Sequence, residues 1–127
     1  MRVLLVEDDN ILGSSLKKAL EKHAYGVDWM RDGESGLEAA ESSHFAAIVL
    51  DINLPGASGL ELARDLLKRD PRRIGLVFVT AYDQPEYRSE AVALGALAYL
   101  PKPFAGEKLL TAVRAAPYVS GGSPPKS

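Results

Sequence analysis

Five short runs rich in apolar residues recur along the chain, and polar, glycine or proline residues interrupt the sequence between them. A run that is apolar at consecutive positions predicts a strand buried on both faces, because a strand with one face in water would alternate apolar with polar residues. The runs therefore predict strands over residues 2–6, 27–30, 45–50, 74–79 and 98–100.

Between these runs the apolar residues recur with the spacing of a helix. In the stretch that follows the first run, Leu12, Leu16 and Leu20 share one face and lysines lie on the other. Asn10 is the expected N-cap of this helix, because a short polar side chain can accept hydrogen bonds from the first free backbone N–H groups. The same reasoning predicts helices over residues 11–22, 34–42, 59–68, 85–94 and 104–115.

Strands that alternate with helices predict an α/β fold, in which a parallel sheet carries helices on both faces and each crossover is right-handed. Both common doubly wound strand orders fit, but five strands in 127 residues favour the flavodoxin-like order 2-1-3-4-5. We predict one (βα)5 domain over residues 1–118. The glycine-, serine- and proline-rich end, residues 119–127, has the composition of a flexible tail or linker.

The composition of the chain argues against several classes of function. The chain is 46% hydrophobic and 25% charged, as in ordinary soluble domains, and its net charge of -2 comes with no basic stripe. Direct nucleic-acid binding by this domain is therefore not expected. The absence of cysteine excludes a disulfide scaffold and any cysteine-based metal site or nucleophile. The first apolar run is too short for a signal peptide or a membrane span, so we expect a cytoplasmic protein without membrane association.

Polar residues follow four of the predicted strands, and the predicted strand order places them at one edge of the sheet, where open α/β folds build their sites. Glu7 and Asp8 follow the first strand, Asp51 the third, Thr80 the fourth and Lys102 the fifth. Three acids in one place repel one another unless a pKa rises or a divalent cation binds. Oxygen ligands without histidine or cysteine favour Mg²⁺.

A carboxylate, Mg²⁺, a hydroxyl and a lysine are the groups that phosphoryl transfer to an aspartate requires. Asp51 would be the nucleophile, and the metal and Lys102 would neutralise charge on the transferring group. Simpler interpretations exist: the acids could form a solvated turn or the acidic start of a helix, and Thr80 and Lys102 could be ordinary strand-end and surface residues.

Four motifs occur in order along residues 1–116: the acid pair within residues 6–9, residues 51–55 followed by Gly59, Thr80-Ala81, and the Tyr-Leu-Pro-Lys-Pro-Phe stretch at 99–104. With these motifs the sequence resembles a response-regulator receiver domain of two-component signalling, in the CheY-like superfamily. The resemblance implies a histidine kinase or phosphotransfer protein as phosphoryl donor, and a downstream protein or effector domain as the recipient of the signal. It also allows a phosphorylation-dependent homodimer.

The resemblance implies which residues hold the metal and the phosphoryl group. Asp51 would accept the phosphoryl group. Asp8 would bind Mg²⁺ directly, Glu7 through a water molecule and Asn53 through its backbone carbonyl, and Asp51 would belong to the same metal site. The protein would be no enzyme toward other molecules, because it would catalyse only its own phosphorylation and dephosphorylation.

The resemblance also implies a switch. Thr80 would swing inward to the phosphoryl oxygens, Lys102 would pair with them, and Tyr99 would turn inward behind Thr80. Pro103 would follow Lys102 through a cis peptide bond. The fourth helix, fifth strand and fifth helix would then form the output face.

Some positions depart from the pattern of receivers that carry DNA-binding domains. Those receivers tend to place an acidic pair just before the strand-five tyrosine, for salt bridges across a dimer, whereas Leu97 and Ala98 stand here. This departure argues against that dimer mode. Tyr82, two residues after Thr80, is bulky, and we hypothesise that it shields the acyl phosphate from water. Trp29 is expected to pack in the core or at the sheet edge.

Three other functions compete. A haloacid-dehalogenase-like phosphatase also uses a strand-end aspartate with Mg²⁺, but its general acid, two residues later, would have to be Asn53. A flavodoxin-like flavin binder would need a phosphate-cradling loop where Glu7 and Asp8 stand. A degenerate receiver would act as a phosphorylation-independent interaction module, and it is disfavoured because every site position is filled.

Overall fold

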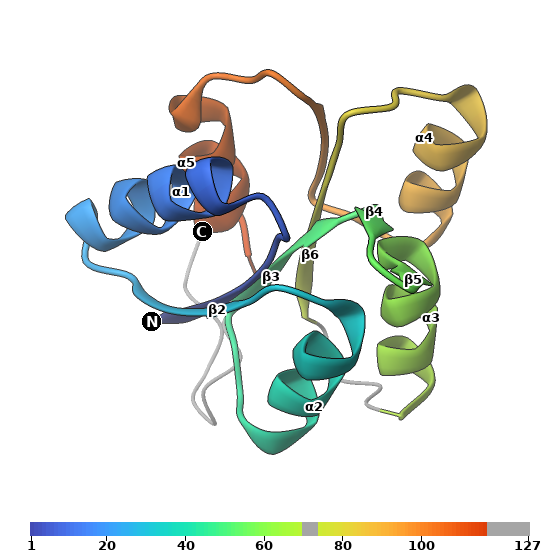
Figure 1. Ribbon diagram of the computed structural model, residues 1–127, viewed down its shortest axis with the longest axis horizontal. Coiled ribbons are helices and arrows are strands. Elements are labelled where there is room, and N and C mark those ends of the chain that lie inside the picture. Colours follow the sequence, from blue (N-terminus) through green and yellow to red (C-terminus); the bar gives the residue numbers. More distant parts are fainter. Residues whose placement is uncertain (70–73, 117–127) are drawn as a thin grey trace.

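The computed structural model describes residues 1–69 and 74–116. A five-stranded parallel sheet with the order β2-β1-β3-β6-β7 forms the centre of the fold (Figure 1). Its strands are β1 (Arg2–Val6), β2 (Gly26–Met30), β3 (Ala47–Asp51), β6 (Gly75–Thr80) and β7 (Ala98–Pro101). The helices are α1 (Asn10–Lys22), α2 (Gly33–Ser42), α3 (Gly59–Arg69), α4 (Pro85–Ala93) and α5 (Gly106–Arg114).

The helices cover both faces of the sheet. Helices α1 and α5 lie together on one face, and α2, α3 and α4 lie on the other (Figure 1). Each face has its own core, because successive side chains of a strand point to opposite sides. Leu4 and Leu50 pack toward α2, α3 and α4, whereas Leu5 and Val49 pack toward α1 and α5. Strand β3 is buried along its whole length, as its unbroken apolar run predicts.

The sheet confirms the predicted flavodoxin-like topology, because its five strands taken in chain order lie in the order 2-1-3-4-5 and all pair in parallel. The registers align the carboxyl ends of the strands. Val6 pairs with Leu50, and Thr80 pairs with Pro101. The residues that follow β1, β3, β6 and β7 therefore meet at one edge.

The start of α1 corrects one prediction. Its N-cap is Asp9 and not Asn10, because Asp9 has extended backbone angles while Asn10 is already helical. Asp9 Oδ1 accepts hydrogen bonds from the backbone N–H groups of Ile11 and Leu12, at 2.9 and 3.1 Å. A charged carboxylate is a strong acceptor at a helix N-terminus, where the helix dipole also favours negative charge.

A small antiparallel hairpin follows β3 and was not predicted. Its strands are β4 (Asn53–Leu54) and β5 (Ala57–Ser58), with Asn53 paired to Ser58. The turn expected at Pro55-Gly56 joins them, and Gly56 has the positive φ of +72° that glycine accepts without strain. Strands of two residues are too short to show a period-two pattern in the sequence.

The ends of three strands also differ from the prediction. Strands β3, β6 and β7 each run one residue further than expected, so Asp51, Thr80 and Pro101 are the last residues of their strands. The predicted tail, residues 119–127, lies outside the described residues, and the domain bounds 1–118 stay a prediction. Over the two described ranges, none of the helices has the length and apolar character needed to cross a membrane.

Candidate functional site

The carboxyl edge of the sheet gathers the predicted site residues. Glu7 and Asp8 come directly after β1, Asp51 ends β3, Thr80 ends β6 and Lys102 follows β7. Carboxylate oxygens of Glu7, Asp8 and Asp51 all lie within 4.8 Å of one another. Glu7 and Asp51 are buried and Asp8 is exposed, so the acid cluster has one side open to solvent.

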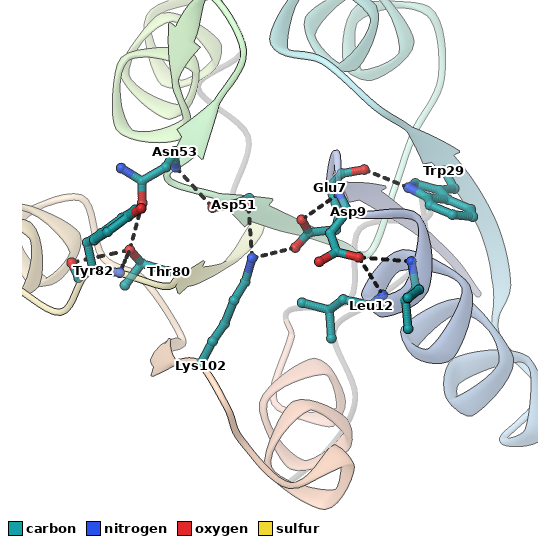
Figure 2. Close-up of polar contacts among 10 residues, drawn as sticks. Glu7, Asp9, Leu12, Trp29, Asp51, Asn53, Thr80, Tyr82 and Lys102 are labelled. Carbon is teal, nitrogen blue, oxygen red and sulfur yellow. Dashed lines mark hydrogen bonds and ion pairs between the residues drawn. The ribbon is translucent and has the colours of Figure 1, made fainter.

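Lys102 bridges the two buried acids (Figure 2). Its Nζ donates to Asp51 Oδ2 at 2.9 Å and lies 3.0 Å from Glu7 Oε1. Burial by itself lowers the pKa of Lys102, but the hydrogen bond to Asp51 and the ion pairs with Asp51 and Glu7 outweigh it, so the net pKa is raised. Lys102 is therefore a fixed cation at the Asp51 carboxylate. The Lys102–Pro103 peptide bond is cis in the structure, the isomer that the resemblance implied.

Glu7 is fully buried, and Lys102 links it to Asp51. Burial raises its pKa from 4.5 to about 7; Lys102 and the Asp9 backbone N–H oppose this rise, and the charge of Asp51 adds to it. Glu7 Oε2 accepts a hydrogen bond from the Asp9 N–H at 3.1 Å. The ion pair of Glu7 Oε1 with Lys102 lacks hydrogen-bond geometry, and within residues 1–69 and 74–116 this oxygen is the one buried side-chain N or O atom without a hydrogen bond.

These residues fit a magnesium ion. The cluster offers only oxygen ligands, which a hard divalent cation prefers, and its exposed side leaves room for the waters that Mg²⁺ keeps. The buried oxygen Glu7 Oε1 accepts no hydrogen bond from the described residues, and a metal-bound water could donate one to it. Asn53 N–H donates to Asp51 Oδ1 at 2.9 Å and so orients the carboxylate. That the Asn53 backbone carbonyl ligates the metal stays a prediction.

Thr80 is buried and is turned toward the hairpin that follows β3 (Figure 2). Its Oγ1 donates to Asn53 Oδ1 at 2.9 Å and accepts from the Tyr82 backbone N–H at 3.0 Å. The Thr80 hydroxyl is thus bound to the residue two positions after Asp51. The Tyr82 side chain is 63% exposed, and its shielding role stays a prediction.

The model of the family described as response regulator receiver domain matches residues 3–114. The chain belongs to this family.

Relatives agree with the assignment. The transcriptional regulatory protein QseB of Escherichia coli O157:H7 is 42% identical over 105 residues, which cover 83% of this chain and 48% of that protein. The chain spans about half the length of the curated relatives it matches. A receiver domain protein (CheY-like) from Methanospirillum hungatei JF-1 is 32% identical, with a TM-score of 0.83 over 89% of this chain and 90% of that one.

A second solved structure is that of a response regulator protein from Burkholderia pseudomallei. It contains a phosphorylated aspartic acid, a calcium ion and citrate. It is 28% identical to this chain, with a TM-score of 0.81, over 90% of this chain and 66% of that one.

The receiver domain holds Tyr99 through contacts that the sequence did not reveal. The Tyr99 hydroxyl donates to Asp83 Oδ1 at 3.0 Å and accepts from the Gln84 N–H at 3.3 Å. Arg88 pairs with Asp83 and lies 4.5 Å from the ring centroid of Tyr99. Burial, with Asp83 adding to it, raises the pKa of Tyr99. Tyr99 is thereby tied to the loop before α4.

Trp29 was expected to be a packing residue, and it does pack, half-buried, against the core between the sheet and α1 and α5. It also makes a polar contact with the site. Its indole N–H donates to the Glu7 backbone carbonyl at 2.9 Å (Figure 2). No local sequence signal marks this contact, because it joins a residue of β2 to the residue that follows β1, 22 positions away in the sequence.

Proposed function

We propose that this receiver domain accepts a phosphoryl group on Asp51 in a Mg²⁺-dependent reaction and that phosphorylation switches the face formed by α4, β7 and α5. The observation that carries the proposal is the environment of Asp51. The buried Asp51 carboxylate accepts a hydrogen bond from Lys102 Nζ at 2.9 Å. It also lies within 4.8 Å of carboxylate oxygens of Glu7 and Asp8. The phosphorylated aspartic acid of the Burkholderia pseudomallei relative supports the same chemistry here.

The transfer uses groups that the fold holds in place. A carboxylate oxygen of Asp51 bonds to phosphorus while the bond from phosphorus to the donor breaks, and the electron pair leaves with the donor atom. Lys102 places positive charge where the phosphoryl oxygens arrive. Glu7, Asp8 and Asp51 would hold Mg²⁺, which neutralises negative charge on the transferring group when bound.

The switch follows from the new charge. Phosphorylation adds about 1.5 to 2 negative charges and three acceptor oxygens at Asp51. Thr80 would exchange Asn53 for a phosphoryl oxygen and draw the loop after β6 inward. Tyr99 is bound to that loop through Asp83 and Gln84, so β7 and α4 would respond to the movement. The free energy available to a partner is limited to the difference between the two states, a few kcal/mol.

The phosphoryl donor would be a cognate histidine kinase or phosphotransfer protein, and the output would be a downstream protein or an effector domain. The relative named as a transcriptional regulatory protein, about half of whose length this chain spans, supports an effector domain in the full-length protein. A phosphorylation-dependent homodimer, a cytoplasmic location and catalysis limited to the protein's own phosphorylation and dephosphorylation belong to the same proposal.

Incubation with acetyl phosphate tests the reaction. We expect the intact mass of the wild type to rise by one phosphoryl group in the presence of Mg²⁺ and to stay constant when EDTA is added. A folded wild type that binds Mg²⁺ and gains no mass would support the degenerate-receiver alternative.

A further inference from the structure

We propose that Trp29 is a positioning residue for the metal site: its indole N–H fixes the peptide plane that carries Glu7 and Asp8, and thereby sets the affinity for Mg²⁺. The inference rests on the proposed function, because it takes the acid pair to be the Mg²⁺ ligands. It goes beyond that function by assigning a role to a side chain that touches neither the metal ligands' carboxylates nor the nucleophile.

The contact extends the sheet where its backbone pairing ends. Strand β1 pairs with β2 up to Val6 and Met30, and Glu7 N–H still donates to the Met30 carbonyl at 3.0 Å. Beyond this point the chain leaves the sheet, because Asp32 already caps α2. The Glu7 carbonyl takes its hydrogen bond from the Trp29 side chain instead, at 2.9 Å.

The carbonyl in question lies in the peptide group between Glu7 and Asp8. Both acids project from this group, so its rotation would move both carboxylates relative to Asp51. The Glu7 side chain is held separately, by the Asp9 N–H and by Lys102. Trp29 therefore fixes the main chain of the acid pair, while other residues fix one of its side chains.

The indole ring of Trp29 is closely packed against its neighbours. A Cβ at Gly13 would lie 2.1 Å from Cζ2 and 2.4 Å from Cε2 of Trp29, so only a glycine at position 13 of α1 leaves room for the ring. The Arg31 guanidinium lies 4.3 Å from the ring centroid, a cation–π contact. A ring in close contact with a helix backbone and with a cation presents its N–H in a fixed direction.

Two substitutions break the contact in different ways. Trp29→Phe keeps an aromatic ring and removes the N–H donor, whereas Gly13→Ala keeps the donor and displaces the ring. Val27→Ala is the control, because it truncates a buried β2 side chain in the same core without touching Glu7. The affinity of the full chain for Mg²⁺ alone is measured from amide chemical shifts, and the same spectra show whether each variant is folded.

We expect Trp29→Phe and Gly13→Ala to weaken Mg²⁺ binding by about tenfold, the lower end of the effect of losing an outer-shell partner of a metal site. Val27→Ala should keep the wild-type affinity. At saturating Mg²⁺ the phosphorylation rates of both Trp29→Phe and Gly13→Ala should return close to that of the wild type, because Asp51 and Lys102 are untouched. If Trp29→Phe binds Mg²⁺ as tightly as the wild type, or if Val27→Ala loses as much Mg²⁺ affinity as Trp29→Phe, the role of Trp29 is overturned and the proposed function is not. A wild type that binds no Mg²⁺ would overturn the metal site and the inference together.

Discussion

Thr80 Oγ1 donates a hydrogen bond to Asn53 Oδ1 at 2.9 Å, so the hydroxyl of the proposed switch residue is bound to the residue two positions beyond the proposed phosphoacceptor. The Asn53 amide nitrogen in turn lies 3.5 Å from the Tyr87 hydroxyl on α4. In the proposed switch this hydrogen bond of Thr80 would break on phosphorylation, because a phosphoryl oxygen would need the same hydroxyl.

Asn53→Ala should therefore favour the switched state. One hydrogen bond contributes about 1 kcal/mol, so the substitution should tighten binding of beryllofluoride, a phosphoryl mimic, by about fivefold. Asn53 orients Asp51 through its backbone N–H, which the substitution retains. A fluorescence or NMR titration measures the affinity. In a Thr80→Ala background the effect of Asn53→Ala should vanish, and an undiminished effect there would contradict the role of the hydrogen bond.

Asp83→Ala should release Tyr99. The variant removes the acceptor of the Tyr99 hydroxyl and a nearby negative charge, both of which raise the pKa of Tyr99 together with burial. The pKa of Tyr99 should therefore fall toward its ordinary value, as measured by NMR with labelled tyrosine. Glu86→Ala removes an exposed acid from α4 and is the matched control. An unchanged pKa of Tyr99 in Asp83→Ala would show that the contact is not made in solution.

The raised pKa of Glu7 predicts that the contribution of Glu7 to the stability of the fold decreases as pH rises. The folded protein keeps the Glu7 proton up to about pH 7, whereas the unfolded chain releases it near 4.5. Between these values the folded state binds more protons, so the contribution of Glu7 to the free energy of unfolding falls as pH rises from about 4.5 to 7. Urea denaturation without metal should show this fall in the wild type.

Glu7→Gln is the control for this pH dependence, because the amide cannot titrate. The variant should lose the part of the pH dependence that Glu7 supplies, and Mg²⁺ affinity in the wild type should rise with pH through about 7 as Glu7 ionises. If Glu7→Gln and wild type follow the same stability curve, the titration belongs to another group.

Lys102→Met should separate metal binding from phosphoryl transfer. Loss of a cation 2.9 Å from Asp51 and 3.0 Å from Glu7 removes repulsion of Mg²⁺, so the metal should bind more tightly. The rate of phosphorylation at saturating Mg²⁺ should fall roughly 100-fold, because a charge that stabilises the transferring group is lost. Lys108→Met, on the exposed face of α5, is the matched control. Weaker Mg²⁺ binding in Lys102→Met would contradict this account.

The fold was predictable because the central strands β1, β3 and β6 are almost entirely apolar and parallel strands bring their carboxyl ends to one edge. This geometric rule predicts that Glu7, Asp8, Asp51 and Lys102 lie together, and in the structure the three acids cluster within 4.8 Å and Lys102 contacts Asp51. The rule works from strand identity alone, so small errors in strand bounds, such as the extra residue of β3, did not disturb it.

The contacts that the sequence did not reveal depend on side-chain directions. Asp9 and Asn10 are both capping residue types, and only the backbone angles decide between them. The hydrogen bonds from Trp29 to Glu7 and from Tyr99 to Asp83 join residues far apart in sequence, through rotamers that packing selects. The pattern of apolar and polar residues along the sequence carries no information on such rotamers.

The most direct test of the central claim compares two aspartate-to-asparagine variants in the acetyl phosphate reaction. Asp51→Asn removes the proposed nucleophile, and Asp65→Asn changes an exposed acid on α3 in the same way. The intact mass of wild type and Asp65→Asn should rise by one phosphoryl group with Mg²⁺, and that of Asp51→Asn should not. A phosphoryl gain on folded Asp51→Asn equal to that of the wild type would show that Asp51 is not the acceptor.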